Sequence, residues 1–147
     1  MLLRLEPDSD IPIYMQIRRQ IVAGFASGEL SAGEQLPSVR QMAVDLGVNL
    51  HTVNKAYALL QDEGYLSMNG RRGAVVTQPP PVDEEFLKRL RAQLRELLME
   101  AKARDGSAEA VDLVWHEARN GIDGWAKPAA KKAGQFGRKS KTEGNRK

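Results

Sequence analysis

The chain has 147 residues, enough for one compact domain with an accessory segment but few for two enzyme-sized domains. It contains no cysteine and only two histidines, His51 and His116, which excludes disulfides, thiolate zinc sites and cysteine nucleophiles and leaves little material for a metal centre. The formal net charge of +3 is unevenly distributed, because residues 127–147 carry 8 basic groups and 1 acidic group whereas residues 1–78 carry 7 and 8.

A first helix is predicted over residues 11–25, where apolar side chains recur at the spacing of one helical face. Asp10 is expected to cap this helix, and Pro12 falls in its first turn, where a missing N–H costs nothing. Gly28 is placed to end it. The apolar stripe marks the face that we expect to pack against the rest of the domain.

Two more helices follow, separated by a very short turn. Ser38 with Gln41 forms the S-x-x-Q pattern of a capping box, and Gly47 is expected to stop this second helix after about two turns. Asn49 is the expected cap of the third helix, which Gly64 closes. Two short helices joined in this way predict a helix-turn-helix.

The next segment predicts a β-hairpin. Two short strands are expected at Tyr65–Met68 and Ala74–Thr77, around an Asn-Gly pair whose two residues accept positive φ. Three helices followed by a hairpin indicate a winged helix-turn-helix over residues 1–78. The prolines of residues 79–83 then predict a stiff linker.

Residues 84–120 are expected to form two helices that have too few apolar residues for a core of their own. Such a stripe must pack on another surface, and a second copy of the chain is the simplest candidate. The residues expected at this dimer interface are Leu87, Leu90, Leu94, Leu97 and Trp115. The basic tail, residues 121–147, is expected to be disordered. The fold class is therefore mainly α with a small β-hairpin, an N-terminal winged helix-turn-helix plus a short C-terminal two-helix dimerisation segment.

The exposed face expected for the third helix carries Asn49, His51, Thr52, Asn54 and Lys55, with no carboxylate among them. An ordinary solvated helix face mixes both signs of charge, so this pattern favours contact with a polyanion over a merely neutral surface. Small polar side chains that can reach base edges, flanked by cations for phosphates, are what a DNA-reading helix needs.

The stretch "LPSVRQMAVDLGVNLHTVNKAYALLQDEG" resembles the DNA-binding domain of GntR-family bacterial transcription regulators, in its elements LPS-x-R, GV, TV, AY and EG. The resemblance extends from Ile11 to Thr77, and the two-helix extension resembles the YtrA-type subgroup, which lacks large ligand-binding domains. It implies a homodimeric, operator-binding repressor. The expected DNA contacts, from the residue pattern and the resemblance together, are Arg40, Asn49, Leu50, His51, Thr52, Asn54, Lys55, Tyr57, Gly70, Arg71 and Arg72.

Some of these residues have expected roles of their own. Leu50 and Asn54 stand where many relatives of the family have arginine; Leu50 could touch a thymine methyl group and Asn54 could pair with adenine. Tyr57 is expected to contact a phosphate only if its hydroxyl is exposed. The paired arginines, Arg71 and Arg72, suit a narrow minor groove at the wing tip.

The function expected from the sequence is that of a sequence-specific regulator, with a repressor favoured, that binds a pseudo-palindromic operator in double-stranded DNA as a homodimer. The alternatives are a nonspecific nucleoid-associated protein that binds through its basic tail, and a winged helix used only for protein interaction. No enzyme, cofactor, metal or membrane partner is expected, and no residue demands a small-molecule effector, although the dimer would have room for one. A bacterial cytoplasmic location at the nucleoid is expected.

Overall fold

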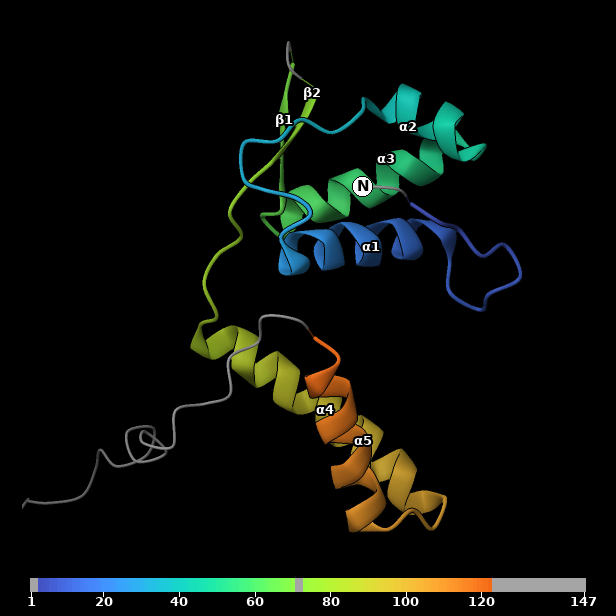
Figure 1. Cartoon of the computed structure of the whole chain (residues 1–147), viewed down its shortest axis with the longest axis vertical. Coiled ribbons are helices and arrows are strands. Elements are labelled where there is room, and N and C mark those ends of the chain that lie inside the picture. The colour runs from blue at the N-terminus through green and yellow to red at the C-terminus, as the bar shows by residue number, and fades with distance from the viewer. Residues whose placement is uncertain (1–2, 71–72, 123–147) are drawn as a thin grey trace, which may run out of the picture.

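The computed structural model of the chain describes residues 3–70 and 73–122. In chain order, its elements are α1 (Ile13–Ser27), α2 (Val39–Leu46), α3 (Leu50–Asp62), β1 (Leu66–Asn69), β2 (Gly73–Val76), α4 (Glu84–Ala103) and α5 (Ala108–Asn120). Helices α1 to α3 and the hairpin form one packed unit, and α4 and α5 lie apart from it beyond the linker (Figure 1). The expected fold class, mainly α with a small β-hairpin wing, is confirmed.

Helix α1 begins later than the sequence pattern suggested. Pro12 occupies the cap position with an extended ψ of 141°, and no side chain caps the helix, so the prediction that Asp10 does so is wrong. Asp10 lies three positions before Ile13, the first helical residue, and does not provide a cap for the free N–H groups of the first turn. The predicted end is confirmed, because Gly28 adopts the left-handed conformation with φ of 80°.

The short turn between α2 and α3 forms from local signals. The Ser38 hydroxyl accepts a hydrogen bond from the Gln41 N–H at 3.2 Å, and the Asn49 side chain accepts one from the His51 N–H at 2.8 Å. Gly47 ends α2 with φ of 65°, a value that side chains disfavour. The Gln41 side chain turns forward to Asp45 instead of back to the cap, so only half of the expected capping box forms.

The hairpin gains a third partner that the sequence did not indicate. Strands β1 and β2 pair antiparallel in the register Leu66↔Val76 to Asn69↔Gly73. On the other edge of β2, the chain before α2 bridges Val75, and the Leu36 N–H donates to the Ala74 carbonyl at 2.9 Å. This segment thus joins α2 to the base of the wing.

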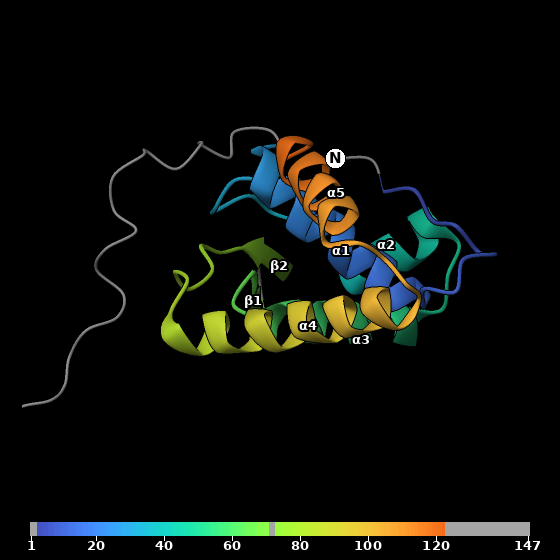
Figure 2. The same ribbon diagram turned by 90° about the horizontal axis from the view of Figure 1, so that it is seen from below.

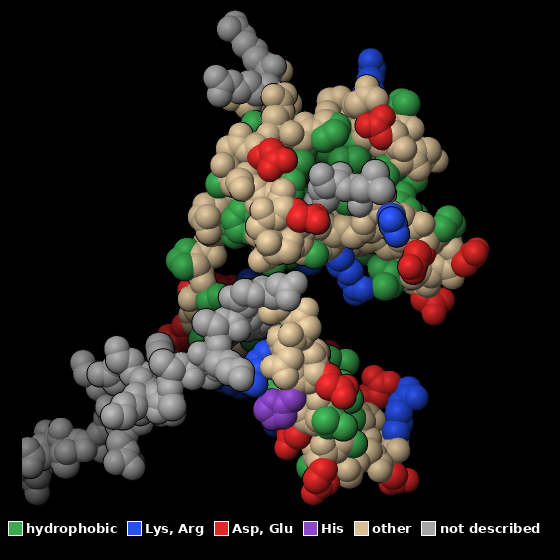
Figure 3. All heavy atoms as spheres, in the orientation of Figure 1, with side chains coloured by type: hydrophobic (Ala, Val, Ile, Leu, Met, Phe, Trp, Pro, Cys, Tyr) green, Lys and Arg blue, Asp and Glu red, His purple; other side chains and the backbone are tan. Residues whose placement is uncertain are grey.

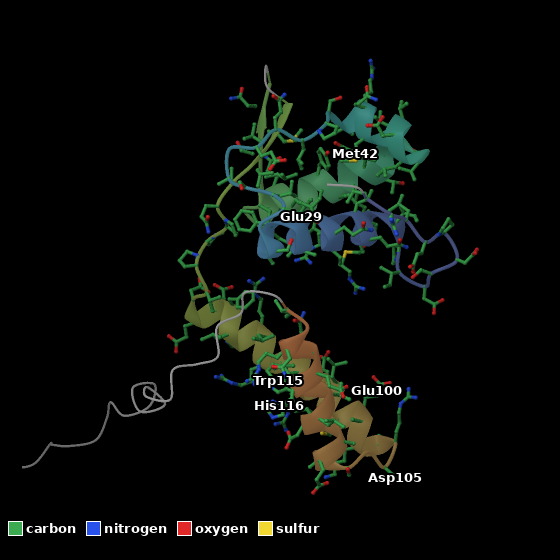
Figure 4. The ribbon with its side chains drawn as sticks, in the orientation of Figure 1. Glu29, Met42, Glu100, Asp105, Trp115 and His116 are labelled. Atoms are coloured by element: carbon green, nitrogen blue, oxygen red, sulfur yellow. The ribbon has the colours of Figure 1, made fainter. Side chains whose placement is uncertain are left out.

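The core of the N-terminal unit lies among the three helices and the inner face of the hairpin. Its largest fully buried side chains are Ile17 and Ile21 of α1, Val53, Tyr57 and Leu60 of α3, and Val76 of β2. Met42 projects from α2 into this core (Figure 4). One buried polar residue, Gln16, anchors the N-terminal segment, because its side chain bonds the N–H and carbonyl of Glu6 and the carbonyl of Ile11.

The two C-terminal helices have side-chain caps but no core. The Asp83 carboxylate accepts from the Phe86 N–H at 2.7 Å at the start of α4, and Ser107 caps α5. No described residue of either helix is buried. The helices diverge from the turn that joins them (Figure 2), so neither covers the apolar face of the other. In residues 3–70 and 73–122, no helix has the length and hydropathy to cross a membrane.

Candidate nucleic-acid interface

The exposed face of α3 has an unusual composition. Asn49, Leu50, His51, Asn54 and Lys55 are exposed, and Thr52 is half-buried. No carboxylate occurs from the cap at Asn49 to Gln61. The first turn also carries the positive end of the helix dipole. The electrostatics of this end of α3 therefore favour a negatively charged partner.

The opposite side of α3 explains why these residues point outward. Val53, Ala56, Tyr57 and Leu60 recur every three or four residues and are buried against α1, α2 and the hairpin. Burial of this stripe fixes the rotation of the helix about its axis. The polar residues between the buried positions must then face solvent.

Lys55 is held in place by a residue of another helix. Its ammonium group lies 4.0 Å from the centroid of the Tyr14 ring of α1, close enough for a cation–π interaction. The sequence placed Tyr14 only on an apolar stripe, and a partner 41 positions away gave no signal there. Arg40 lies exposed on the first turn of α2 and forms no ion pair with a described residue. Both cations are available to a polyanion.

Tyr57 is a structural residue. Its exposed fraction is 1%, and its hydroxyl donates a hydrogen bond to the Pro37 carbonyl at 2.9 Å. Burial raises the pKa of the Tyr57 hydroxyl, because the phenolate would lose its hydration. The condition for a phosphate contact, an exposed hydroxyl, is not met, and that expectation is wrong.

The remaining expected site residues lie in the wing and in the apolar stripe of α4 and α5. Gly70 is exposed at the end of β1, whereas Arg71 and Arg72 lie outside the described residues. Along α4 and α5 the stripe residues face solvent, with Leu94 half-buried and Leu87, Leu90, Leu97 and Trp115 exposed. Hydrophobic side chains stand among charged ones over these helices (Figure 3), and Trp115 and His116 project from α5 (Figure 4).

The structure also exposes apolar residues that the sequence pattern had not singled out. Val44 of α2 is 74% exposed beside the helix-turn-helix, and Leu98, Met99 and Leu113 are more than half exposed on the C-terminal helices. Val44, Met99 and Leu113 fall outside the regular stripes, so periodicity could not mark them, whereas Leu98 follows Leu94 by four positions and lies beside the α4 stripe. Within the described ranges no group of three or more His, Asp or Glu side chains could hold a metal ion.

Similarity to known proteins agrees with this geometry. The family of bacterial regulatory proteins named gntR matches residues 13–76. The transcriptional repressor YtrA of Bacillus subtilis is 31% identical over 102 residues, which are 68% of this chain and 78% of that protein. The chain belongs to the GntR family. YtrA from Sulfolobus acidocaldarius, a GntR-family transcription factor, superposes with a TM-score of 0.56 at 39% identity. The superposition covers 70% of this chain and 99% of that one. The expected resemblance to YtrA-type members of the family is therefore confirmed.

Other matches differ in extent. A protein from Listeria monocytogenes described as a transcriptional antiterminator superposes with a TM-score of 0.76 at 25% identity, over 83% of this chain and 92% of that one. The probable rhizopine catabolism regulatory protein MocR of Rhizobium meliloti is 39% identical over 80 residues, but these are only 16% of its length. The match to MocR therefore concerns a small part of a much longer protein.

Proposed function

We propose that the chain is a sequence-specific DNA-binding transcription regulator that acts as a homodimer on an operator with two half-sites. The observation that carries the proposal is the exposed, carboxylate-free first half of α3 in a winged helix-turn-helix of the GntR family. A helix of this kind, with its N-terminus toward the duplex, fits the major groove.

The side chains divide into two groups by the contacts their chemistry allows. Asn54 can form a bidentate pair with adenine, and Leu50 can touch a thymine methyl group. Asn49, His51 and Thr52 surround the helix start, where phosphates or base edges lie within reach. In the second group are Arg40 and Lys55, whose charges suit the phosphate backbone on the two sides of α3.

The wing would contact the adjacent minor groove. Gly70 is exposed where β1 ends, and the sequence places Arg71 and Arg72 directly after it. Arginine is the side chain that a narrow minor groove attracts most, because the negative potential there is enhanced. This part of the proposal rests on the sequence and on the position of the hairpin beside α3.

The homodimer is supported by the exposed apolar residues of α4 and α5. Leu97 is 63% exposed and Trp115 is 47% exposed, and burying such side chains stabilises association. Two copies joined through these helices would present two α3 helices. Their half-sites are then expected about 34 Å apart, one helical turn, or a multiple of it. The proposed domain limits remain 1–78, 79–83, 84–120 and 121–147.

Repression is the favoured outcome of binding. The Bacillus subtilis relative is named a transcriptional repressor, and a bound dimer can block access to a promoter without any further contact. A small-molecule effector could act at the dimer interface, although no described residue requires one.

Competition gel shifts with the chain's own promoter test the proposal. Asn54→Ala should weaken binding to the preferred sequence by about 1–3 kcal/mol and relax specificity, whereas Arg40→Ala should weaken binding to all sequences alike. Gln61→Ala, on an exposed position at the far end of α3, is the matched control and should change neither. The proposal fails if the wild-type protein binds its promoter no better than random DNA at about 0.15 M salt.

One alternative has an observation of its own, the 8 basic groups against 1 acidic group in residues 127–147. A tail of this kind binds DNA nonspecifically through counterion release. Deletion of residues 127–147 would abolish binding by a nucleoid-associated protein, but it should leave the operator complex proposed here largely intact.

A further inference from the structure

The chain between β2 and α4 is attached to the residues that follow α3 by three contacts. The Thr77 hydroxyl donates a hydrogen bond to the Gly64 carbonyl at 2.8 Å. The Thr77 N–H donates to the Tyr65 carbonyl at 2.9 Å. Pro80 packs on Gly64 so closely that an added Cβ would lie 2.8 Å from its Cδ. We call these residues, Gly64, Thr77 and Pro80, the junction.

The junction is fixed to the rest of the DNA-binding unit as well. Glu63, next to Gly64, forms a salt bridge with Arg18 of α1, whose Nε shares its N–H between the two carboxylate oxygens at 2.8 and 3.1 Å. The Tyr65 ring meets the Phe25 ring of α1 edge-on at 6.2 Å between centroids. The end of α3 is therefore braced against α1 on one side and against the linker on the other.

Little free chain remains beyond the junction. Pro81, Val82 and Asp83 separate Pro80 from the first residue of α4, and the Asp83 side chain already caps that helix. Three residues span at most about 10 Å, and the ring of Pro81 fixes one of their φ angles. The direction in which the linker leaves the N-terminal unit thus limits where α4 can lie.

We propose that the junction sets which half-site spacing the dimer accepts. This inference rests on the function proposed above, in which α4 and α5 join two copies and each α3 reads one half-site. The junction connects the end of α3 to the linker that leads to the dimerisation helices. A fixed junction holds the two α3 helices at one separation and one relative rotation, and a loosened junction lets each unit turn toward its half-site independently.

The structure also admits a simpler role, in which these contacts only stabilise the hairpin and the end of α3. The two roles predict different results. A purely stabilising contact changes the melting temperature and leaves the spacing preference of the folded dimer unchanged. A positioning contact changes the spacing preference while binding to a single half-site stays the same.

The test compares full-length variants on duplexes with different spacings. The probe is a duplex of about 30 base pairs that contains the half-sites selected from random DNA by the wild-type protein, together with versions lengthened or shortened by about two base pairs. Such a change moves the half-sites by about 7 Å and rotates them by about 70°. Thr77→Val combined with Pro80→Ala removes the hydrogen bond and the ring contact, and Thr77→Ser is the control that keeps the hydroxyl.

We expect the wild-type protein and Thr77→Ser to prefer the selected spacing by roughly tenfold or more, and the double variant to show at most about a threefold preference. Affinity for a duplex with one half-site should be equal in all three proteins. A double variant that keeps the wild-type preference overturns the inference and leaves the proposed function standing. If the wild-type protein selects no sequence or is monomeric, the proposed function fails and the inference with it. Should the double variant not fold, Thr77→Val alone carries the comparison.

Discussion

Replacing Tyr57 with phenylalanine tests whether this residue acts in the fold or at DNA. The side chain is 1% exposed, and its hydroxyl reaches the Pro37 carbonyl at 2.9 Å, directly before the cap of α2. Phenylalanine keeps the buried ring and removes only the hydrogen bond. The Pro37 carbonyl then loses this partner in a partly buried place.

The size of the effect follows from that geometry. Loss of one partner from a partly buried hydrogen bond costs about 1 kcal/mol. For a cooperative unit of roughly 60–100 residues, each kcal/mol lowers the melting temperature by about 4–8 °C. Thermal unfolding followed by circular dichroism measures this change, and gel shifts at a temperature where both proteins are folded by this assay measure DNA affinity separately.

Tyr14→Phe provides the matched control. The Tyr14 ring would stay beneath the Lys55 ammonium, and its hydroxyl forms no hydrogen bond with a described residue, so we expect a change within about 0.5 kcal/mol. The reasoning is refuted if Tyr57→Phe leaves the melting temperature unchanged while DNA affinity falls tenfold. That result would mean that the hydroxyl turns outward to a phosphate.

Three further predictions follow from other parts of the chain. Changing both Leu90 and Leu94 to glutamate should give monomers in sedimentation experiments and weaken operator binding. The control Ala92→Glu, on the opposite side of α4, should stay dimeric. If the double variant stays dimeric, the α4 stripe is not part of the interface. Gln16→Ala should lower the free energy of unfolding, measured in urea, by about 2–3 kcal/mol, because three hydrogen bonds from the Gln16 side chain to backbone groups are lost. A loss below about 0.5 kcal/mol would contradict this role. Burial raises the pKa of Tyr57 above its ordinary value of 10.0, so the unfolded chain ionises first as the pH rises. Stability should be complete below about pH 10 and fall above it by up to about 1.4 kcal/mol per pH unit, and this contribution to the slope should be absent in Tyr57→Phe.

Helix limits were predictable where the decisive contact lies within a few residues of the signal. Ser38 and Asn49 cap the helices that follow them, and Gly47 ends α2 in the left-handed conformation. Asp10 failed as a cap, because Pro12 took the cap position itself. A sequence pattern shows which residues can cap a helix, but it does not fix the residue at which the helix begins.

Contacts between distant parts of the chain were not predictable in the same way. The Tyr57 hydroxyl is bonded to the carbonyl of Pro37, which lies 20 positions earlier in the chain. The Lys55 ammonium lies over the ring of Tyr14, which belongs to another helix. Gln16 was not singled out either, since glutamine is mostly exposed and its three partners are backbone groups that only the folded chain brings together. The outward-facing residues of α3 were predictable, because the period of the helix separates them from the buried stripe.

Strand β2 is hydrogen-bonded on both of its edges, so the strand register is constrained more strongly at the base of the wing than at its tip. A slip of one residue would turn Ala74 and Val76 out of the core and break hydrogen bonds on both sides of the strand at once. The register is thus locked below the last pair, Asn69 with Gly73. Residues inserted or exchanged between these two leave the paired and buried positions of the hairpin unchanged, so the core does not constrain the length and charge of the segment that connects the strands.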